Sequence, residues 1–301
     1  MGCQAVFCLM PSILLVEKRL MLKPELRRPT AILAALAVCA ALSGCIFTSD
    51  YGRATVPAST SAVMPVASPV GVDVKSQNGR IVIIQDSTAS EATVSAMAKL
   101  QDQDRAERFT IETTLDDNGT LVVRPVWPDG KRRRNESCSF EITAPALHGI
   151  VADTSNGSIT LRGGMGKTRL ESSNGAIRVE GRQGGVYART SNGRIELDRC
   201  TGDFDLNTSN GAVKISGSAP ATGEAFAWHV STSNGSITLD LDQPLVARLN
   251  ASTSNGRAKL ERTTSGGDTR RLVSGRSIEF GDGPGEVTLK TSNGAITVRT
   301  P

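Results

Sequence analysis

The sequence predicts an all-β protein, and more narrowly a parallel β-solenoid (a single-stranded β-helix) with coils of about 18 residues and two insertions. Ser-Asn-Gly recurs at a nearly fixed spacing, and apolar residues alternate with polar ones on both sides of each copy. Only 4% of the 301 residues are aromatic, whereas 30 are glycine. Small and β-branched side chains must therefore fill the core, as they do in regular stacks of short strands.

The amino-terminal part, residues 1–44, has the pattern of an export signal. Basic residues precede an apolar run over residues 31–42, which leads into Leu42-Ser43-Gly44-Cys45. This ending resembles the bacterial lipobox, so Cys45 is the predicted lipidation site. The alternative is a membrane-spanning helix, but the run is shorter than the roughly 20 residues that a span needs. Met21 opens a signal of ordinary length, which suggests that residues 1–20 stem from a start codon placed too early.

The charge of the chain is nearly balanced once residues 1–44 are removed. The remainder keeps 29 basic and 28 acidic residues, so no electrostatic footprint for nucleic acid remains and no nucleic-acid partner is expected. Residues 45–69 are rich in Ser, Thr, Ala and Pro without periodicity, which predicts a flexible tether. The solenoid domain is expected over residues 70–301.

The Ser-Asn-Gly repeat is the main evidence for the fold. Its asparagines and glycines are predicted to form one corner of the coils, with a structural role: Asn156, Gly157, Asn174, Gly175, Asn192, Gly193, Asn210, Gly211, Asn234, Gly235, Asn255, Gly256, Asn293 and Gly294. A looser first copy has Gln77-Asn78-Gly79. Apolar residues stand six and four positions before the asparagine, and three and five positions after it. Each copy therefore predicts two short strands with period-two alternation.

Asn-Gly between strands normally indicates a two-residue hairpin. Separate hairpins would leave many strand edges unpaired, whereas stacked copies form parallel ladders around one continuous core. We therefore expect eight coils that stack in chain order. At the repeated corner, the glycine is expected to take a positive φ and the asparagine side chains to hydrogen-bond along the stack. A second corner is marked by Gly166, Gly184, Gly202, Pro220 and Pro244.

Two insertions interrupt the repeat, at residues 85–149 and 262–286. The first is expected to hold a short polar helix near residues 102–108 and strands over residues 109–114, 121–126 and 138–143. The second is rich in glycine. The last coil, over residues 287–299, is expected at the end of the stack, with the second insertion folded across that end as a charged cover.

The repeated rungs resemble a known bacterial family. Thr-Ser-Asn-Gly-x-Ile-x-Leu segments behind a lipoprotein signal, with Gly281-Asp282-Gly283 before the last rung, are similar to envelope domains of unknown function called "putative adhesins". The resemblance covers about residues 70–301. It implies a single-stranded β-helix at the surface or in the periplasm, and it carries no catalytic residue to transfer. A more distant likeness is to bactofilins, which are polymer-forming solenoids.

Few sequence features suggest a ligand, and neither a metal site nor a cofactor is predicted. Residues 163–168 look like a phosphate loop, but Leu161 stands where the loop needs glycine, and no helix is expected to follow. His148 and His229 are expected as surface or corner residues. The basic run over residues 131–134 favours a solvated loop over a contact with a polyanion or a lipid headgroup.

Two acid pairs and one cysteine pair remain as candidates. Glu180 with Asp198, or Asp153 with Glu171, would be adjacent on neighbouring rungs and could hold a cation or act on a glycosidic bond. No aromatic platform for a sugar is expected near either pair. Cys138 and Cys200 could form a disulfide in an oxidising compartment.

The predicted function is that of a non-catalytic cell-envelope lipoprotein, a scaffold or adhesion module. The membrane is its expected partner through the lipid anchor, together with a protein or glycan of the envelope. Ile46 is not the Asp associated with retention in the inner membrane, so the outer membrane is favoured for a Gram-negative cell. The alternatives are an enzyme that acts on polysaccharide, since β-helices also host such enzymes, and a polymer-forming scaffold of the bactofilin kind.

Overall fold

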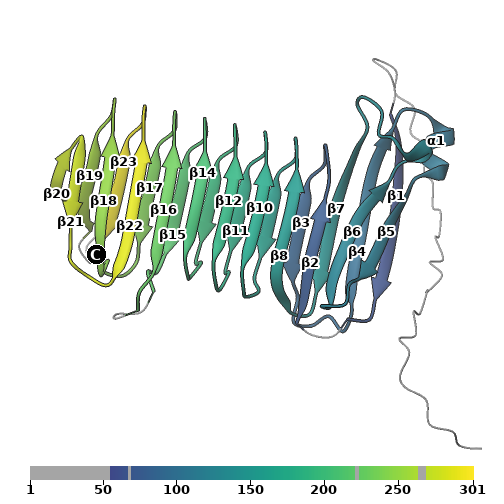
Figure 1. Ribbon diagram of the computed structural model, residues 1–301, viewed down its shortest axis with the longest axis horizontal. Coiled ribbons are helices and arrows are strands. Elements are labelled where there is room, and N and C mark those ends of the chain that lie inside the picture. Colours follow the sequence, from purple (N-terminus) through teal and green to yellow (C-terminus); the bar gives the residue numbers. More distant parts are fainter. Residues whose placement is uncertain (1–54, 67–68, 221–223, 264–268) are drawn as a thin grey trace, which may run out of the picture. The chain divides into compact units, whose positions relative to one another are not determined.

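The structure is a computed structural model that describes residues 55–66, 69–220, 224–263 and 269–301 (Figure 1). The predicted signal at residues 1–44 and the predicted lipidation site Cys45 lie outside the described residues. The strands form two sheets, which we call sheet A and sheet B. Sheet A has 12 strands and sheet B has 11.

Each coil contributes one strand to each sheet, and neighbouring coils pair in parallel. Ile177 pairs with Ile159 on one side and with Ile195 on the other, and all three side chains are fully buried. Burying one such side chain contributes roughly 1.5–3 kcal/mol. The alternation of buried and outward residues follows the period-two pattern of the sequence. The predicted parallel β-solenoid is confirmed.

Eight coil strands, one from each coil, follow one another in space along each sheet. In sheet B they are β2 (Val70–Lys75), β8 (Leu147–Thr154), β10 (Thr168–Ser172), β12 (Val186–Thr190), β14 (Phe204–Thr208), β16 (Ala227–Thr232), β22 (Gly285–Thr291) and β18 (Ala247–Thr253). In sheet A they are β3 (Ile81–Gln85), β9 (Ile159–Arg162), β11 (Ile177–Glu180), β13 (Ile195–Asp198), β15 (Val213–Gly217), β17 (Ile237–Leu241), β23 (Ile296–Thr300) and β19 (Ala258–Thr263).

The last coil of the chain is not the last coil of the stack. Strand β22 lies between β16 and β18, and β23 lies between β17 and β19. The coil that was expected at the open end therefore has both of its edges paired. The prediction that the coils stack in chain order is wrong at this end. Equivalent rungs pair in the same register, so a rung can also pair with one that is not its neighbour in the sequence.

The second insertion covers the end of the stack, although over a different coil from the one predicted. Strand β20 (Thr269–Gly275) pairs antiparallel with β19, and β21 (Ser277–Phe280) pairs antiparallel with β18. Both strands lie at the yellow-green end of Figure 1. Arg270 and Arg271 are exposed on the edge strand β20. A charged edge disfavours pairing with another chain.

The first insertion extends both sheets at the opposite end instead of separating two coils. Strands β2 and β3 pair directly with β8 and β9, so the first two coils are continuous. On the other side of this first coil, β6 (Thr120–Val126) pairs with β2 and β7 (Ser137–Ala144) pairs with β3, both in parallel. Three antiparallel strands and two short helices complete this end: β1 (Val56–Met64), β4 (Ala92–Leu100), β5 (Thr110–Leu115), α1 (Gln103–Arg108) and η1 (Pro128–Gly130).

Part of the predicted tether is a strand. Residues 56–64 form β1, which pairs antiparallel with β4 along its whole length, from Val56 opposite Leu100 to Met64 opposite Ala92. The absence of apolar periodicity in this segment suggested a flexible chain. Alternate positions nevertheless turn toward the core, so a run rich in Ala, Ser and Thr is sufficient for an edge strand. A flexible tether over all of residues 45–69 is therefore wrong for residues 56–64.

A buried ion pair holds the first insertion together. Arg105 is 1% exposed and Glu136 is 0% exposed, and the Arg105 guanidinium donates to both Glu136 carboxylate oxygens, at 2.6 and 2.9 Å. Burial alone would raise the pKa of Glu136, but hydrogen bonds from Arg105 and from two backbone amides outweigh it and hold that pKa below its usual range. The remaining Arg105 donors reach the carbonyl oxygens of Pro128 and Lys131.

The Asn-Gly corner is held by a chain of asparagine hydrogen bonds. The Nδ2 of Asn192 donates to Oδ1 of Asn174 at 2.6 Å, and Asn210 donates to Asn192 at 2.8 Å. The chain continues through the inserted coil, because Asn293 donates to Asn234 and Asn255 donates to Asn293. The order of the asparagines along these hydrogen bonds is therefore the spatial order of the coils.

The corner glycines are required by close contact rather than by backbone angle. A Cβ on Gly193 would lie 1.9 Å from the carbonyl oxygen of Gly175, and the other corners are as tight. Residues with positive φ in the described structure do not include these glycines, so the expected positive φ is wrong. Positive φ occurs at the second corner instead, at Gly166 (85°), Gly184 (114°) and Gly202 (110°).

A buried hydroxyl two positions before each asparagine completes the corner. The Thr190 hydroxyl donates to the Gly175 carbonyl at 3.0 Å and accepts from the Gly193 N–H at 3.2 Å. Ser172 and Thr208 make the same two contacts in their own coils. These hydroxyls satisfy backbone groups that would otherwise be buried without partners. The sequence shows Ser or Thr at this position of every copy, and that regularity could have identified the role.

Candidate functional site

The outer face of sheet A is covered by ion pairs between neighbouring strands. Arg178 of β11 pairs with Glu196 of β13, which also accepts from Arg194 at 3.1 Å. Further along the sheet, Arg299 of β23 bridges Asp240 at 2.8 Å and Glu261 at 3.4 Å. Cross-strand pairs of this kind support neighbouring rungs. Most charges on this face therefore already have partners.

The outer face of sheet B has a different charge pattern. Within the described structure, ion pairs on this face join Arg169 to Glu171 at 2.8 Å and Arg124 to Asp73 at 2.8 Å. The outward charges of its central strands otherwise have no ion-pair partner in the described part of the chain: Lys167, Arg189, Asp203 and Asp205. Unpaired charges on a rigid sheet remain available to a ligand or partner.

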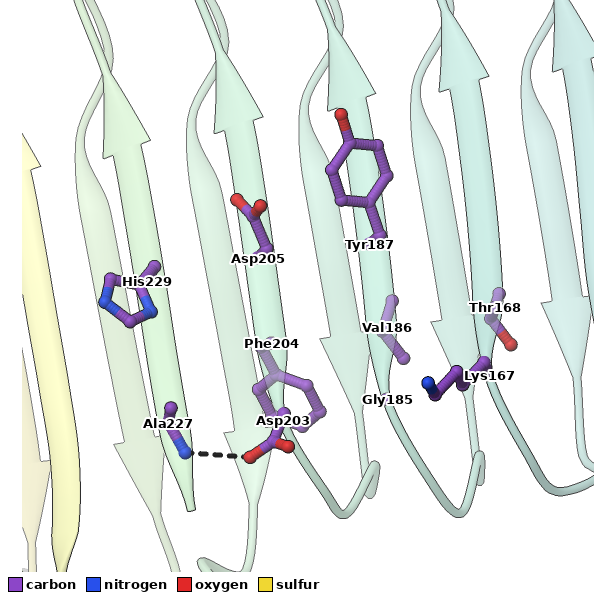
Figure 2. Close-up of a pocket in the computed structure, with 10 residues that line it drawn as sticks. All are labelled: Lys167, Thr168, Gly185, Val186, Tyr187, Asp203, Phe204, Asp205, Ala227 and His229. Atoms are coloured by element: carbon purple, nitrogen blue, oxygen red, sulfur yellow. Dashed lines mark hydrogen bonds between the residues drawn. The ribbon is translucent and has the colours of Figure 1, made fainter.

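A hollow of about 330 Å³ opens on this face across β10, β12, β14 and β16 (Figure 2). Gly185 and Ala227 contribute almost no side chain, which leaves the space open. Lys167 reaches toward Gly185 from one side, and Asp203 lies on the other side. One Asp203 carboxylate oxygen accepts the Ala227 N–H at 2.8 Å, which fixes the orientation of this carboxylate.

Tyr187 forms the upper wall of the hollow, with Asp205 on the next strand and His229 one strand further (Figure 2). The guanidinium groups of Arg169 and Arg189 pack on the Tyr187 ring, at 4.9 and 4.7 Å from its centroid. Tyr187 was not singled out from the sequence, and its ring, covered by guanidinium groups, is not an open aromatic platform for a sugar. It stands five positions before Asn192, an outward position in the predicted register, so the sequence contained the signal.

The two predicted acid pairs are adjacent, but three of the four carboxylates already contact other groups. Glu180 aligns with Asp198 and Asp153 with Glu171. Arg162 donates to Glu180 at 3.1 Å, whereas Asp198 pairs with Arg199 at 2.8 Å and accepts from Ser216 at 3.0 Å. Arg169 pairs with Glu171, as described above. None of the four carboxylates is buried.

The two histidines are both exposed, in β8 and β16. His229 aligns with Asp205 on the neighbouring strand and borders the hollow, whereas His148 packs beside the corner at Gly166. In the described part of the chain, no group of three or more His, Cys, Asp or Glu side chains is placed to hold a metal ion. Among the same residues, no helix is long and apolar enough to cross a membrane.

The glycine-rich segment at residues 163–168 is a corner that covers a buried arginine. Arg182 is fully buried beneath it and donates to the carbonyl oxygens of Gly163 and Gly166, at 3.3 and 3.2 Å. Burial lowers the pKa of Arg182 to about 10. The segment leads into strand β10 rather than into a helix, so it lacks the amide dipoles of a phosphate loop.

The cysteines do not form the disulfide that the sequence left open. Cys138 and Cys200 are both free and buried. Cys138 lies in β7 and Cys200 follows β13, and three strands separate β7 from β13 in sheet A. At about 4.8 Å per strand the two lie far beyond the reach of a disulfide. Burial raises the pKa of the Cys138 thiol to about 12, which disfavours the reactive thiolate.

The basic run at residues 131–134 belongs to the first insertion and contacts protein groups. Arg132 donates to the side chain of Gln77 at 2.6 Å and to the carbonyl of Glu136 at 2.9 Å. Arg133 pairs with Asp102 at 3.4 Å, and its backbone N–H donates to Glu136 at 2.7 Å. Arg132 and Arg133, two of the four cations in this run, therefore stabilise the insertion.

Comparison with known proteins gives a family and several solved structures. A structure named "putative adhesin" from Bacteroides fragilis is 15% identical, with a TM-score of 0.38, over 80% of this chain and 96% of its own. One named "putative cell adhesion protein" from Clostridium sporogenes is 13% identical, with a TM-score of 0.30, over 81% of this chain and 100% of its own. No curated protein sequence matches the chain. The family model described as Toastrack DUF4097 matches residues 72–299, and the chain therefore belongs to the Toastrack family.

Proposed function

We propose that this protein is a non-catalytic module of the bacterial cell envelope, anchored through a lipid on Cys45, which binds a partner with the outer face of sheet B. The contrast between the two outer faces carries the proposal. Sheet A uses its charges in ion pairs between coils, whereas sheet B leaves charges unpaired around a hollow. A repeat scaffold commonly uses one such extended face for binding.

The surroundings of the acid pairs favour binding over hydrolysis. A general acid at a glycosidic bond needs a raised pKa, which an apolar and desolvated pocket supplies. Glu180, Asp198 and Glu171 are instead only half-buried, and each contacts an arginine.

A binding screen with two charge-reversal variants tests the proposal. The full chain would be tested against glycans, envelope polymers and envelope proteins, with the release of soluble fragments monitored in parallel. We expect Arg189→Glu, on sheet B, to weaken binding at least tenfold, and Lys214→Glu, on sheet A, to leave it unchanged. Equal loss in both variants would contradict a binding face on sheet B. Fragment release that disappears in Glu180→Gln or Glu171→Gln would show an enzyme instead.

The anchor can be tested separately. Cys45→Ala removes the only predicted lipid acceptor, so we expect the protein to move from the detergent phase to the aqueous phase after extraction. Several acyl chains would exceed what stable anchoring requires, so the shift should be nearly complete. Unchanged partitioning of the variant would disprove lipid anchoring at this residue.

A further inference from the structure

The hollow on sheet B separates two charges of opposite sign. Lys167, Gly185 and Asp203 occupy equivalent positions immediately before the strands β10, β12 and β14, because Thr168 pairs with Val186 and Val186 pairs with Phe204. Lys167 and Asp203 are thus two strand spacings apart, about 9.6 Å between their backbones. No ion pair joins them in the described structure, and the glycine between them leaves the intervening space open.

The neighbouring side chains reinforce this separation. Arg189 lies over the ring of Tyr187, which lines the hollow, and adds positive charge at its border. Asp205, two residues after Asp203, adds negative charge on the other side, and His229 borders that side (Figure 2). The hollow therefore has a cationic half at Lys167, on the side of β10, and an anionic half at Asp203 and Asp205, on the side of β14.

This charge distribution excludes several simple ligands on electrostatic grounds. A plain anion attracted by Lys167 would be repelled by the two aspartates, and a plain cation would be repelled by Lys167 and Arg189. A neutral sugar would need an open aromatic face, but guanidinium groups already occupy the Tyr187 ring. A ligand that carries both charges can satisfy both halves at once.

We propose that the hollow over Gly185 binds a dipolar ligand, a group that carries a carboxylate and an ammonium on one short chain, as amino acids and short peptides do. Lys167 receives the carboxylate and Asp203 receives the ammonium, with Asp205 adding to the negative half. This inference rests on the proposed binding role of sheet B and specifies the ligand class of that face.

Nuclear magnetic resonance titration of the full chain in detergent tests the proposal. The probe is 6-aminohexanoate, compared with hexanoate and hexylamine, which each carry only one of the two charges. We expect 6-aminohexanoate to shift the amide signals of Lys167, Gly185 and Asp203, with at least tenfold tighter binding than either control. Equal binding of hexylamine or hexanoate would overturn the proposal, and so would shifts confined to other strands.

Charge-reversal variants add a second test. Lys167→Glu and Asp205→Lys should each weaken binding at least tenfold, whereas Lys214→Glu on sheet A should have no effect. Asp205 is the safer acid to reverse, because Asp203 also accepts the Ala227 N–H. The double variant Lys167→Asp/Asp203→Lys re-creates the dipole in the opposite direction. A small probe can turn around, so this variant should recover much of the binding; failure of a folded double variant to do so would contradict dipolar recognition.

The outcomes also separate this inference from the proposed function. If the dipolar probe does not bind but Arg189→Glu still abolishes binding of an envelope partner, only the ligand class is wrong. If neither the probe nor any envelope component binds sheet B, the proposed function fails as well.

Discussion

At the scale of single residues, the corner glycines offer the sharpest test of how the coils stack. Gly193→Ala would place a methyl group 1.9 Å from the Gly175 carbonyl oxygen, so backbone must move in two coils. We expect a loss of about 3 kcal/mol or more in the free energy of unfolding. Gly149→Ala is the matched control, because the atom nearest to its Cβ would be the Lys167 carbonyl oxygen, at 3.9 Å. Equal thermal stability of the two variants would disprove a contact role for the corner glycine.

The same residues show what a sequence can and cannot predict at this scale. Period-two alternation correctly placed the core residues, because the pleat of a strand has a fixed period. The role of Gly193 was predicted for the wrong reason, since a local Asn-Gly signal points to backbone angle and not to the approach of another coil. Tyr187 was overlooked because its importance depends on two arginines that the fold brings onto its ring.

At the scale of elements, the Arg105–Glu136 pair fixes the helix α1 and the strands of the first insertion. Arg105→Met leaves the Glu136 carboxylate buried without its main partner, and we expect a loss of about 3–5 kcal/mol at neutral pH. Because the folded pKa of Glu136 is lowered, its stabilising contribution is present above about pH 4.5 and is lost as the pH falls through the folded value. Unfolding by denaturant at several pH values would measure both effects.

The double variant Arg105→Met/Glu136→Leu is the control for this prediction. Replacing both charges with apolar side chains removes the unpaired buried carboxylate, so much of the stability should return. If Arg105→Met alone is as stable as the parent at neutral pH, the pair does not support the insertion. Retention of the acid sensitivity in the double variant would assign that sensitivity to other carboxylates.

In the first insertion, the elements with local sequence signals were predicted, whereas the strands that depend on non-local pairing were not. Strands near residues 109–114, 121–126 and 138–143 and the helix near 102–108 were predicted, because β-branched runs, a turn at Asp116 to Gly119 and the Asp102 cap are local. Strands β1 and β4 were not predicted. Each is rich in small residues, and each depends on pairing with the other, from Val56 opposite Leu100 to Met64 opposite Ala92. A single sequence does not reveal such a pairing.

At the scale of the whole domain, the order of the coils is the feature that the repeat could not predict. Every rung presents the same apolar columns and the same asparagine, so any two rungs are compatible neighbours. The chain places its last coil between β16–β17 and β18–β19, and the cover formed by β20 and β21 makes this arrangement possible. The connection between β19 and β22 therefore also serves as the end cap.

The end cap should control self-association. Replacing residues 264–284 with a short Gly-Ser linker removes β20 and β21 and exposes the edges of β18 and β19. Unprotected parallel edges invite pairing with another chain, so we expect oligomers that grow with protein concentration. Light scattering would compare this variant with the parent and with Arg270→Ser, which alters only one charge of the cap. A variant that associates no more than the parent would disprove the capping role.

Because the last coil of the chain lies inside the stack, we expect its loss to destabilise a coil that precedes it in the sequence. Deleting residues 285–301 removes β22 and β23 and leaves β16–β17 and β18–β19 facing each other across an empty position. In a solenoid stacked in chain order, loss of the last coil would expose one edge and leave earlier coils protected. Here we expect hydrogen exchange to lose protection in β18 and β19 as well, while β8 to β13 stay protected. A variant truncated after Thr300, which lacks only Pro301, serves as the control. If β18 and β19 keep their protection in the deletion variant, they can close directly onto β16 and β17, and the last coil is not needed to hold them.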